Sequence, residues 1–179
     1  INYAKNILIG PPLHETASEI LGPRHKGKLN QFIKLFIKTH DEQAILQIKA
    51  YPKVNETLFE LHEKKIPMSI ATNKRKFPTL KLIESLGWKK YFSIIECSDS
   101  KNKPRKKTNL IKDIINLNEE FTGGFFVGDT INDGVSANLN NLRFVKASYG
   151  YGFNQDWGAV QIEKEIDCLD ELLKFNEYL

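Results

Sequence analysis

The amino-acid sequence predicts an α/β protein with a parallel sheet, and three observations support that fold class. Short apolar runs of strand length occur at residues 68–71, 93–95 and 125–127. Longer segments in which apolar side chains recur with helical spacing separate these runs. Polar residues follow two of the runs, Thr72 directly and Asp129 after one glycine. Strands that alternate with helices in this way are typical of βαβ units, so we expect one parallel sheet covered by helices.

The first fifty residues differ from the rest and predict a small helical unit. Glycine and proline interrupt them twice, and no stretch shows the alternation of a β-strand. The expected elements are a helix at 13–21, a solvated basic loop at 24–28, an amphipathic helix from Leu29 and a short segment at 44–48. We therefore divide the chain into a helical unit, residues 1–50, and an α/β unit, residues 51–179.

In the second unit, helices and strands alternate in order. The expected helices are 55–65, 78–86, 108–117, 135–142 and a closing helix at 167–178. The expected strands are 68–71, 93–95 and 125–129, with an edge strand beginning at 144–145. Gly87 favours the end of the second of these helices, and a polar, lysine-rich loop spans residues 98–107.

Composition places the chain among globular proteins of ordinary size. With 179 residues, 41% hydrophobic and 27% charged, it can form one domain, or a core with a small appendage. The apolar runs are too short for a membrane span, and no signal-peptide pattern opens the sequence. Two cysteines, Cys97 and Cys168, are too few for a disulfide framework and favour a reducing cytoplasm. The net charge of +4 fits an anionic substrate without requiring one.

The most informative motif is FFVGDTIND at residues 125–133. Asp129 ends the expected strand, and open α/β sheets place their ligands at the carboxyl ends of strands. Asp133 follows as the chain turns toward a helix. Two carboxylates directed at one crevice repel each other unless a cation or a proton lies between them, and such oxygen ligands suit Mg²⁺. The alternative is a tight turn with one Asp as a helix cap and the other facing solvent.

Two further features bear on chemistry. Thr72 would face the same crevice as Asp129, and its hydroxyl and the following N–H groups can bind a phosphate oxygen. A threonine that caps the next helix is the alternative. Asn73 and Lys74 can reach the distal part of a substrate, although Lys74 by itself also fits an ordinary surface lysine.

The loop at 98–107 can also supply a lysine that neutralises a phosphate and nearby carboxylates. Its basic residues are Lys101, Lys103, Arg105, Lys106 and Lys107. The alternatives are a solvated loop and a nucleic-acid or localisation patch. We place nucleic-acid binding last, because no aromatic residues are interleaved with these charges.

Together these features resemble the haloacid dehalogenase (HAD) superfamily, and specifically its phosphoglycolate phosphatase-like branch. MSIATNK resembles the family's second motif, and FFVGDTIND resembles its fourth. The branch also carries phrases similar to IGPPLHET in a helical cap, YPKVNETLFEL at the return to the core, and GYG after the fourth motif. These phrases occur here at 9–16, 51–61 and 150–152, so the resemblance covers most of the chain in the family's order.

The resemblance implies a three-layer, Rossmann-like core with a parallel sheet and a small helical cap. It implies a magnesium-dependent phosphomonoester phosphatase that acts on a small phosphorylated metabolite, such as phosphoglycolate, through an aspartyl-phosphate. Thr72 would bind the phosphate, and Asp129 and Asp133 would bind Mg²⁺. The third motif is a single lysine that fits either Lys103 or Lys107, and we favour Lys107 because it directly precedes the helix at 108–117.

The family's first motif, an Asp-x-Asp-x-Thr sequence after an amino-terminal strand, has no counterpart in the sequence. The chain begins inside the expected cap, and Asp41 follows a helical stretch, so we reject it as the nucleophile. One hypothesis is a phosphatase fragment, inactive by itself, whose nucleophile lies upstream of Ile1. The other is a degenerate, non-catalytic protein that binds phosphate, a metal or a partner.

In the family, the nucleophile strand lies between the strands that correspond to residues 68–72 and 125–129. We therefore expect a strand-completing segment, or a strand from a partner chain, at that place in the sheet. The sequence leaves the identity of the phosphate ester and the oligomeric state open.

Overall fold

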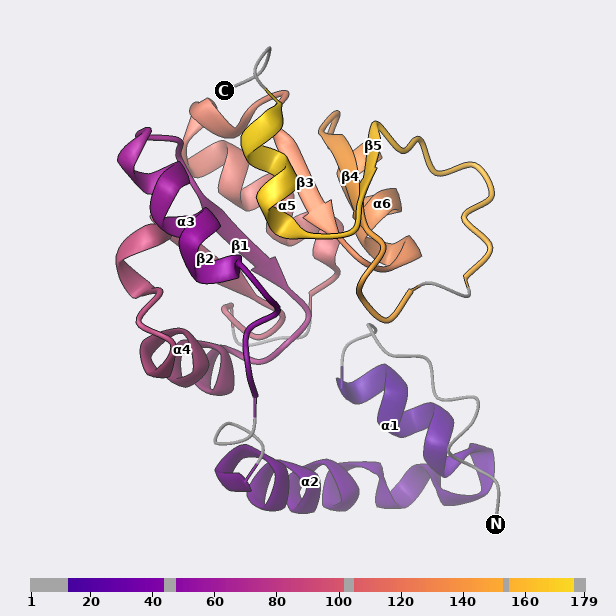
Figure 1. The fold of residues 1–179 in the computed structure, drawn as a ribbon. Helices are drawn as coiled ribbons and strands as arrows, with labels where there is room; N and C mark the ends of the chain where they lie inside the picture. Colours follow the sequence, from indigo (N-terminus) through magenta and orange to yellow (C-terminus); the bar gives the residue numbers. More distant parts are fainter. Residues whose placement is uncertain (1–12, 44–47, 102–104, 153–154, 176–179) are drawn as a thin grey trace.

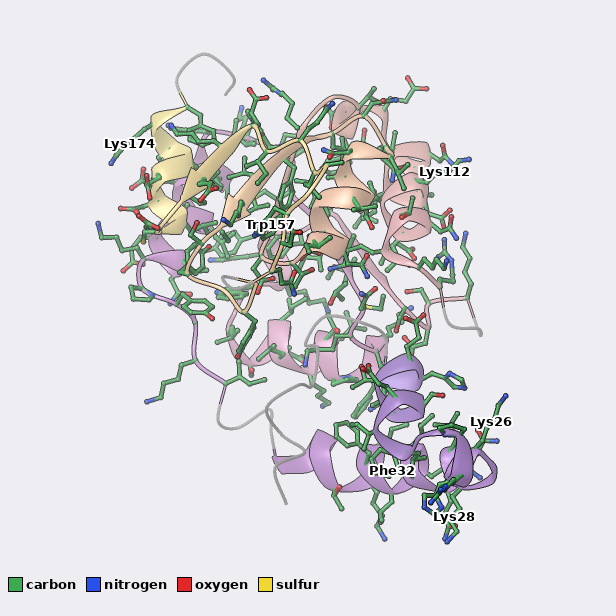
Figure 2. All side chains as sticks on the ribbon, turned by 90° about the vertical axis from the view of Figure 1, so that its right-hand side faces the viewer. Lys26, Lys28, Phe32, Lys112, Trp157 and Lys174 are labelled. Atoms are coloured by element: carbon green, nitrogen blue, oxygen red, sulfur yellow. The ribbon has the colours of Figure 1, made fainter. Side chains whose placement is uncertain are left out.

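The computed structural model describes residues 13–43, 48–101, 105–152 and 155–175 (Figure 1). Its first part is a helical unit made of α1 (Leu13–Leu21), the 3₁₀ helix η2 (Pro23–Lys28) and α2 (Leu29–Gln43). These helices pack against one another and bury Ala17 and Leu29. Residues 24–28 are exposed, as expected, and the side chains of Lys26 and Lys28 point outward (Figure 2). They form a 3₁₀ helix, however, rather than a loop.

The remaining elements alternate between helix and strand. The α-helices are α3 (Val54–Glu63), α4 (Lys76–Ser85), α5 (Lys107–Leu117) and α6 (Ile131–Asn138). The strands are β1 (Ser69–Thr72), β2 (Ile94–Cys97), β3 (Phe125–Gly128), β4 (Arg143–Ala147) and β5 (Lys164–Ile166). The 3₁₀ helices are η4 (Lys89–Tyr91), η5 (Glu119–Phe121) and η6 (Leu169–Lys174). None of the helices in the described ranges is long and apolar enough to cross a membrane.

The strands form two parallel sheets. β1 pairs with β2, and β4 lies between β3 and β5. The arrows of β1 and β3 point the same way in Figure 1, so both strands bring their carboxyl ends to one side of the molecule. The expectation that residues 144–145 begin an edge strand is wrong, because β4 is central and β5 forms the edge.

Helices cover both faces of the sheets, which confirms a three-layer, Rossmann-like α/β fold (Figure 1). On one face α5 packs against β1 and β2, and α6 packs against β3 and β4. On the other face lie α3 and η6, which pack against each other. The side chains of β4 alternate between these layers: Phe144 packs in a cluster with Ile111, and Val145 packs in a cluster with Phe175.

Two other elements differ from the prediction, and a third lies mostly outside the described residues. The helix expected at 135–142 is α6, which begins four residues earlier, at Ile131, because Thr130 caps it. The closing helix expected at 167–178 is the short 3₁₀ helix η6 within the described residues. The segment expected at 44–48 lies outside the described residues except for its last position.

An apolar cavity of about 510 Å³ lies between β1 and β3. Its lining includes Ser69, Ile70 and Ala71 of β1, Phe125, Phe126 and Val127 of β3, Ile111 and Ile114 of α5, Leu58 and Leu61 of α3, and Leu172 of η6. One edge of β1 pairs with β2, and one edge of β3 pairs with β4. Among the described strands, the other edge of each has no hydrogen-bonded neighbour, and these two edges flank the cavity.

Candidate active site

Asp133 is the most firmly held of the predicted site residues. It is the third residue of α6, and it forms a reciprocal capping box with Thr130. Its Oδ2 atom accepts hydrogen bonds from the Thr130 N–H at 2.9 Å, the Thr130 hydroxyl at 2.7 Å and the Asp129 N–H at 3.2 Å. Because Asp133 is only 3% exposed, the alternative in which this aspartate faces solvent is wrong.

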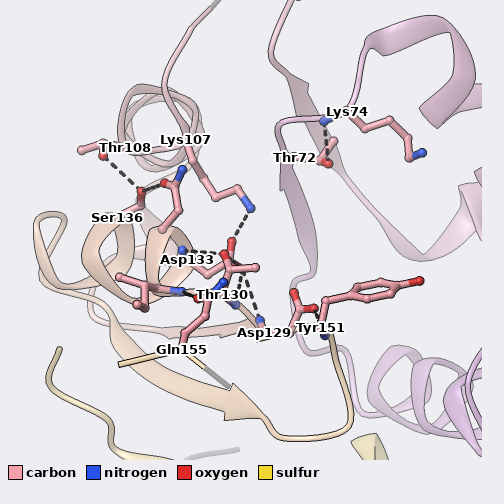
Figure 3. A network of polar contacts seen from close by, with 12 residues as sticks. Thr72, Lys74, Lys107, Thr108, Asp129, Thr130, Asp133, Ser136, Tyr151 and Gln155 are labelled. Atoms are coloured by element: carbon pink, nitrogen blue, oxygen red, sulfur yellow. Dashed lines mark hydrogen bonds and ion pairs between the residues drawn. The ribbon is translucent and has the colours of Figure 1, made fainter. Parts of the chain in front are cut away.

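Lys107 brings a positive charge to Asp133 from a different element. It is the first residue of α5, and its Nζ contacts Asp133 Oδ1 (Figure 3). Only 12% of the Lys107 side chain and 4% of the Asp133 side chain are exposed. A buried carboxylate is costly unless it is paired, and the contact with Lys107 supplies that pairing.

Other residues of the basic loop are directed toward β2 and α5. Arg105 contacts Glu96 at 3.2 Å and also pairs with Asp113, as does Lys101. The bonds from Lys101 and Arg105 hold the pKa of Asp113 below its usual range. Lys103 lies outside the described residues. Within the described part of this loop, Lys107 is therefore the residue that forms an ion pair with the acidic motif.

Asp129 directly follows β3, and its carboxylate is held at one oxygen. Oδ2 accepts the backbone N–H of Tyr151 at 2.8 Å. Within the described residues, no other protein donor is hydrogen bonded to this carboxylate, so Oδ1 is available to a ligand. Burial raises the pKa of the nearby Tyr149 to about 12, and the charge of Asp129 adds to that shift. Tyr149 is therefore a neutral phenol at neutral pH.

Thr72 ends β1, and its Oγ1 accepts the Lys74 N–H at 3.1 Å. This bond closes a turn and leaves the hydroxyl hydrogen of Thr72 available to an acceptor. Asn73 is buried and Lys74 is exposed. Figure 3 shows Thr72 across from Lys107, whose side chain extends toward it. Among the described residues, no hydrogen bond joins Thr72 to Lys107 or to the two aspartates.

The described residues supply few metal ligands. They contain no group of three or more His, Cys, Asp or Glu side chains that could hold a metal ion. Both oxygens of Asp133 already contact protein donors, whereas one oxygen of Asp129 does not. Mg²⁺ commonly takes one or two carboxylates together with waters and phosphate oxygens. Asp129 therefore fits a direct metal ligand better than Asp133 does.

Replacing Thr130 with Val should lower the free energy of unfolding by about 1–2 kcal/mol, because an N-cap is lost. The change keeps the shape of the side chain but removes the hydroxyl that donates to Asp133. Urea denaturation measures the effect. Thr122→Val, at an exposed position, is the matched control and should leave stability nearly unchanged. Equal stability of both variants would contradict the capping role.

The sequence did not reveal that one loop closes over this motif. Besides the Tyr151 N–H on Asp129, the side-chain Oε1 of Gln155 accepts the Ile131 N–H at 2.8 Å. The loop therefore holds both the carboxylate and the first residue of α6. The available signal was the GYG phrase at 150–152, but its contact with Asp129 joins residues 22 positions apart and depends on the tertiary fold.

Comparisons with known proteins match most of this chain. The family model for haloacid dehalogenase-like hydrolases matches residues 4–147. The phosphoglycolate phosphatase of Photobacterium profundum is 28% identical over 177 residues, which cover 97% of this chain and 76% of that protein. The phosphoglycolate phosphatase of Agrobacterium fabrum is 28% identical over 133 residues, which cover 73% of this chain and 55% of that protein. The match thus spans a little over half the length of the Agrobacterium relative.

Solved structures share the fold. A haloacid dehalogenase-like hydrolase from Bacteroides fragilis matches with a TM-score of 0.82 and 21% sequence identity. The match covers 92% of this chain and 79% of that one. At this level of identity, the likeness shows a common arrangement of helices and strands.

Proposed function

Because the chain belongs to the haloacid dehalogenase-like hydrolase family, we propose that it supplies the phosphate-binding and metal-binding part of a magnesium-dependent phosphomonoester phosphatase. One observation carries this proposal. At the carboxyl end of β3, Asp133 contacts both the Lys107 side chain and the backbone N–H of Asp129. The substrate we propose is a small phosphorylated metabolite similar to phosphoglycolate. Relatives that are phosphoglycolate phosphatases support this substrate class.

The chain's own residues would bind the phosphoryl group. Lys107 has three N–H donors, so it can contact Asp133 and a phosphate oxygen at the same time. The Thr72 hydroxyl and the N–H groups that follow it would donate to the other oxygens. Asn73 and Lys74 would contact the distal part of the substrate. Such donors stabilise the charge that develops on the phosphoryl oxygens.

Asp129 would hold Mg²⁺ through the carboxylate oxygen that Tyr151 does not bind. Bound Mg²⁺ neutralises charge on the phosphoryl oxygens and so favours attack by an anionic nucleophile. Asp133 would support this site indirectly, because its two oxygens hold Lys107 and Thr130 in place. We therefore assign direct metal binding to Asp129 and positioning to Asp133.

The nucleophile would be carried by a strand that fills the cavity between β1 and β3. A central strand lies about 4.8 Å from each neighbour and would pair both unpaired edges. Apolar side chains from helices on both faces line the cavity, so a continuously apolar strand fits it. An aspartate at the carboxyl end of that strand would lie between the ends of β1 and β3. The strand can belong to the same protein or to a partner chain.

The proposed reaction has two steps. A carboxylate oxygen of this aspartate attacks phosphorus while the bond to the leaving oxygen breaks, and a second aspartate gives that oxygen a proton. Water then hydrolyses the aspartyl-phosphate. The helical unit of residues 1–50 would act as a cap that excludes bulk water and selects the substrate. We place the protein in a reducing cytoplasm, in keeping with the free thiols of Cys97 and Cys168.

Replacing Lys107 with Ala should weaken the binding of inorganic phosphate by about 10- to 100-fold. The reason is the loss of a charge-assisted hydrogen bond worth about 1.5–3 kcal/mol. Lys101→Ala is the matched control, because Lys101 pairs with Asp113 and its side chain is 59% exposed. Phosphate titrations at one fixed, high concentration of Mg²⁺, followed by the NMR shifts of the Thr72 and Asp129 amides, give both affinities.

The outcomes of this titration are distinct. Equal losses in the two variants would contradict the role of Lys107. A larger loss in Lys103→Ala would assign the phosphate-binding lysine to Lys103. Failure of the unaltered chain to bind phosphate near Thr72 would contradict the proposed function itself.

A further inference from the structure

We propose that the loop of residues 150–152 is a positioning element for Asp129 as a metal ligand. The backbone of the loop holds one carboxylate oxygen, and the other oxygen is thereby oriented for the ion. This inference rests on the proposed metal role of Asp129. It assigns to Gly150, Tyr151 and Gly152 a role in metal affinity that they perform through Asp129, without touching the ion.

The first observation is the hydrogen bond between the loop and the carboxylate. The Tyr151 N–H lies 2.8 Å from Asp129 Oδ2, and Figure 3 shows the two residues side by side. A carboxylate whose one oxygen is held cannot rotate freely about its Cβ–Cγ bond. Hydrogen bonds of this kind orient metal-binding side chains and tune their affinity. The donor here is a backbone group, so the side chain of Tyr151 is not required for it.

The second observation is that both glycines leave no space for a side chain. A Cβ atom on Gly150 would lie 2.2 Å from Asp129 Cβ and 2.4 Å from its Oδ2. A Cβ atom on Gly152 would lie 1.8 Å from the carbonyl oxygen of Asp129. Neither glycine has a positive φ. Glycine is therefore needed at these positions because of the close approach to Asp129, not because of an unusual backbone conformation.

The third observation is a second anchor on the same segment. Gln155 accepts the Ile131 N–H at 2.8 Å, two residues beyond Asp129. The side chain of Tyr151 is 63% exposed, and Gly152 is buried. The backbone of Tyr151 and the side chain of Gln155 thus both contact the segment 129–131. The connection of β4 to β5 does not require two glycines to lie this close to Asp129. Their close approach therefore supports a role in positioning its carboxylate.

The test measures Mn²⁺ binding, because Mn²⁺ takes the same oxygen ligands as Mg²⁺ and broadens nearby amide signals in NMR spectra. In the unaltered chain, Mn²⁺ should broaden the amides of residues 129–131. Gly150→Ala should weaken this binding at least tenfold, because the new methyl group would overlap the Cβ and the carboxylate of Asp129 and so displace that carboxylate. Gly152→Ala should have at least the same effect, since its methyl group meets the Asp129 backbone.

Three control variants separate positioning from general damage. Gly27→Ala makes the same chemical change where no heavy atom lies within 4 Å of the new Cβ, and it should bind Mn²⁺ as the unaltered chain does. Tyr151→Ala keeps the N–H donor and should also retain binding. Gly134→Ala crowds Val160, 2.4 Å from the new Cβ, without touching Asp129. This variant shows whether overpacking within α6, away from Asp129, lowers the Mn²⁺ affinity by itself.

Each result decides between the alternatives. Unchanged Mn²⁺ affinity in folded Gly150→Ala would overturn the positioning role while leaving Asp129 as a ligand. An equal loss in Gly134→Ala would also overturn it, since the effect would then follow from packing. If Mn²⁺ fails to broaden the amide signals of residues 129–131 in the unaltered chain, the proposed metal function is wrong. The positioning role of the loop is then wrong as well. If Gly152→Ala does not fold, Gly150→Ala alone decides.

Discussion

Asp129→Asn should remove magnesium-dependent behaviour from this protein. The substitution keeps an oxygen that can accept the Tyr151 N–H, so the loop and the fold should persist. It replaces the anionic oxygen that we propose as the metal ligand with a neutral amide. In the protein completed by its nucleophile strand, we expect hydrolysis of p-nitrophenyl phosphate to fall by about 10²–10³-fold or more, the cost typical of losing one transition-state charge stabiliser.

A second readout does not depend on turnover. A ligand that binds only the folded state raises its stability, by about 2.7 kcal/mol at one hundred times its Kd. Mg²⁺ should therefore raise the melting temperature of the unaltered protein and leave that of Asp129→Asn unchanged. Asp156→Asn, at an exposed position in the loop before β5, is the control and should keep the full shift. An unchanged magnesium response in Asp129→Asn would contradict the assignment.

The second large effect concerns the cavity between β1 and β3. We expect the 179-residue chain by itself to show no turnover of p-nitrophenyl phosphate with Mg²⁺, because its sequence contains no strand that ends in an Asp-x-Asp motif. A peptide with an apolar strand followed by that motif should bind the cavity. It should protect the backbone amides of β1 and β3 from hydrogen exchange, since it pairs with both open edges.

Two control peptides sharpen this test. A proline in the middle of the strand removes a donor that the sheet needs, so that peptide should not bind. An Asn in place of the first Asp should leave binding intact and prevent turnover, because the nucleophile is absent. Robust turnover without any peptide would show that the nucleophile lies elsewhere in the chain. An experimental structure with β1 and β3 directly paired would favour the non-catalytic alternative.

The elements that the sequence predicted well are those with strong local signals. The strands expected at 68–71 and 125–129 match β1 and β3 to within one residue at each end, because short buried strands carry nearly continuous apolar side chains. The start of α6 was placed too late for a local reason as well. The helix begins with a capping box between Thr130 and Asp133, whereas the sequence had suggested a capping role only for an aspartate of this motif and none for Thr130.

The features that the sequence missed depend on contacts between distant residues. β5 consists of Lys164, Glu165 and Ile166, of which only Ile166 is buried. Such a segment has no strand pattern of its own and becomes a strand because β4 offers an edge. The contact of Lys107 with Asp133 agrees with the helix-start position favoured for the lysine. The GYG phrase at 150–152, in contrast, does not by itself indicate that these residues return to Asp129.

The ion pair between Lys107 and Asp133 also sets the electrical balance of the proposed site. The charge of Lys107 is matched by Asp133, while Asp129 has no ion pair among the described residues. A phosphate dianion would thus meet uncompensated negative charge unless a divalent cation is already present. Metal and phosphate would then be thermodynamically linked ligands, and each would raise the affinity for the other by the same factor. An apparent affinity for either one would have a fixed value only at a stated concentration of the other.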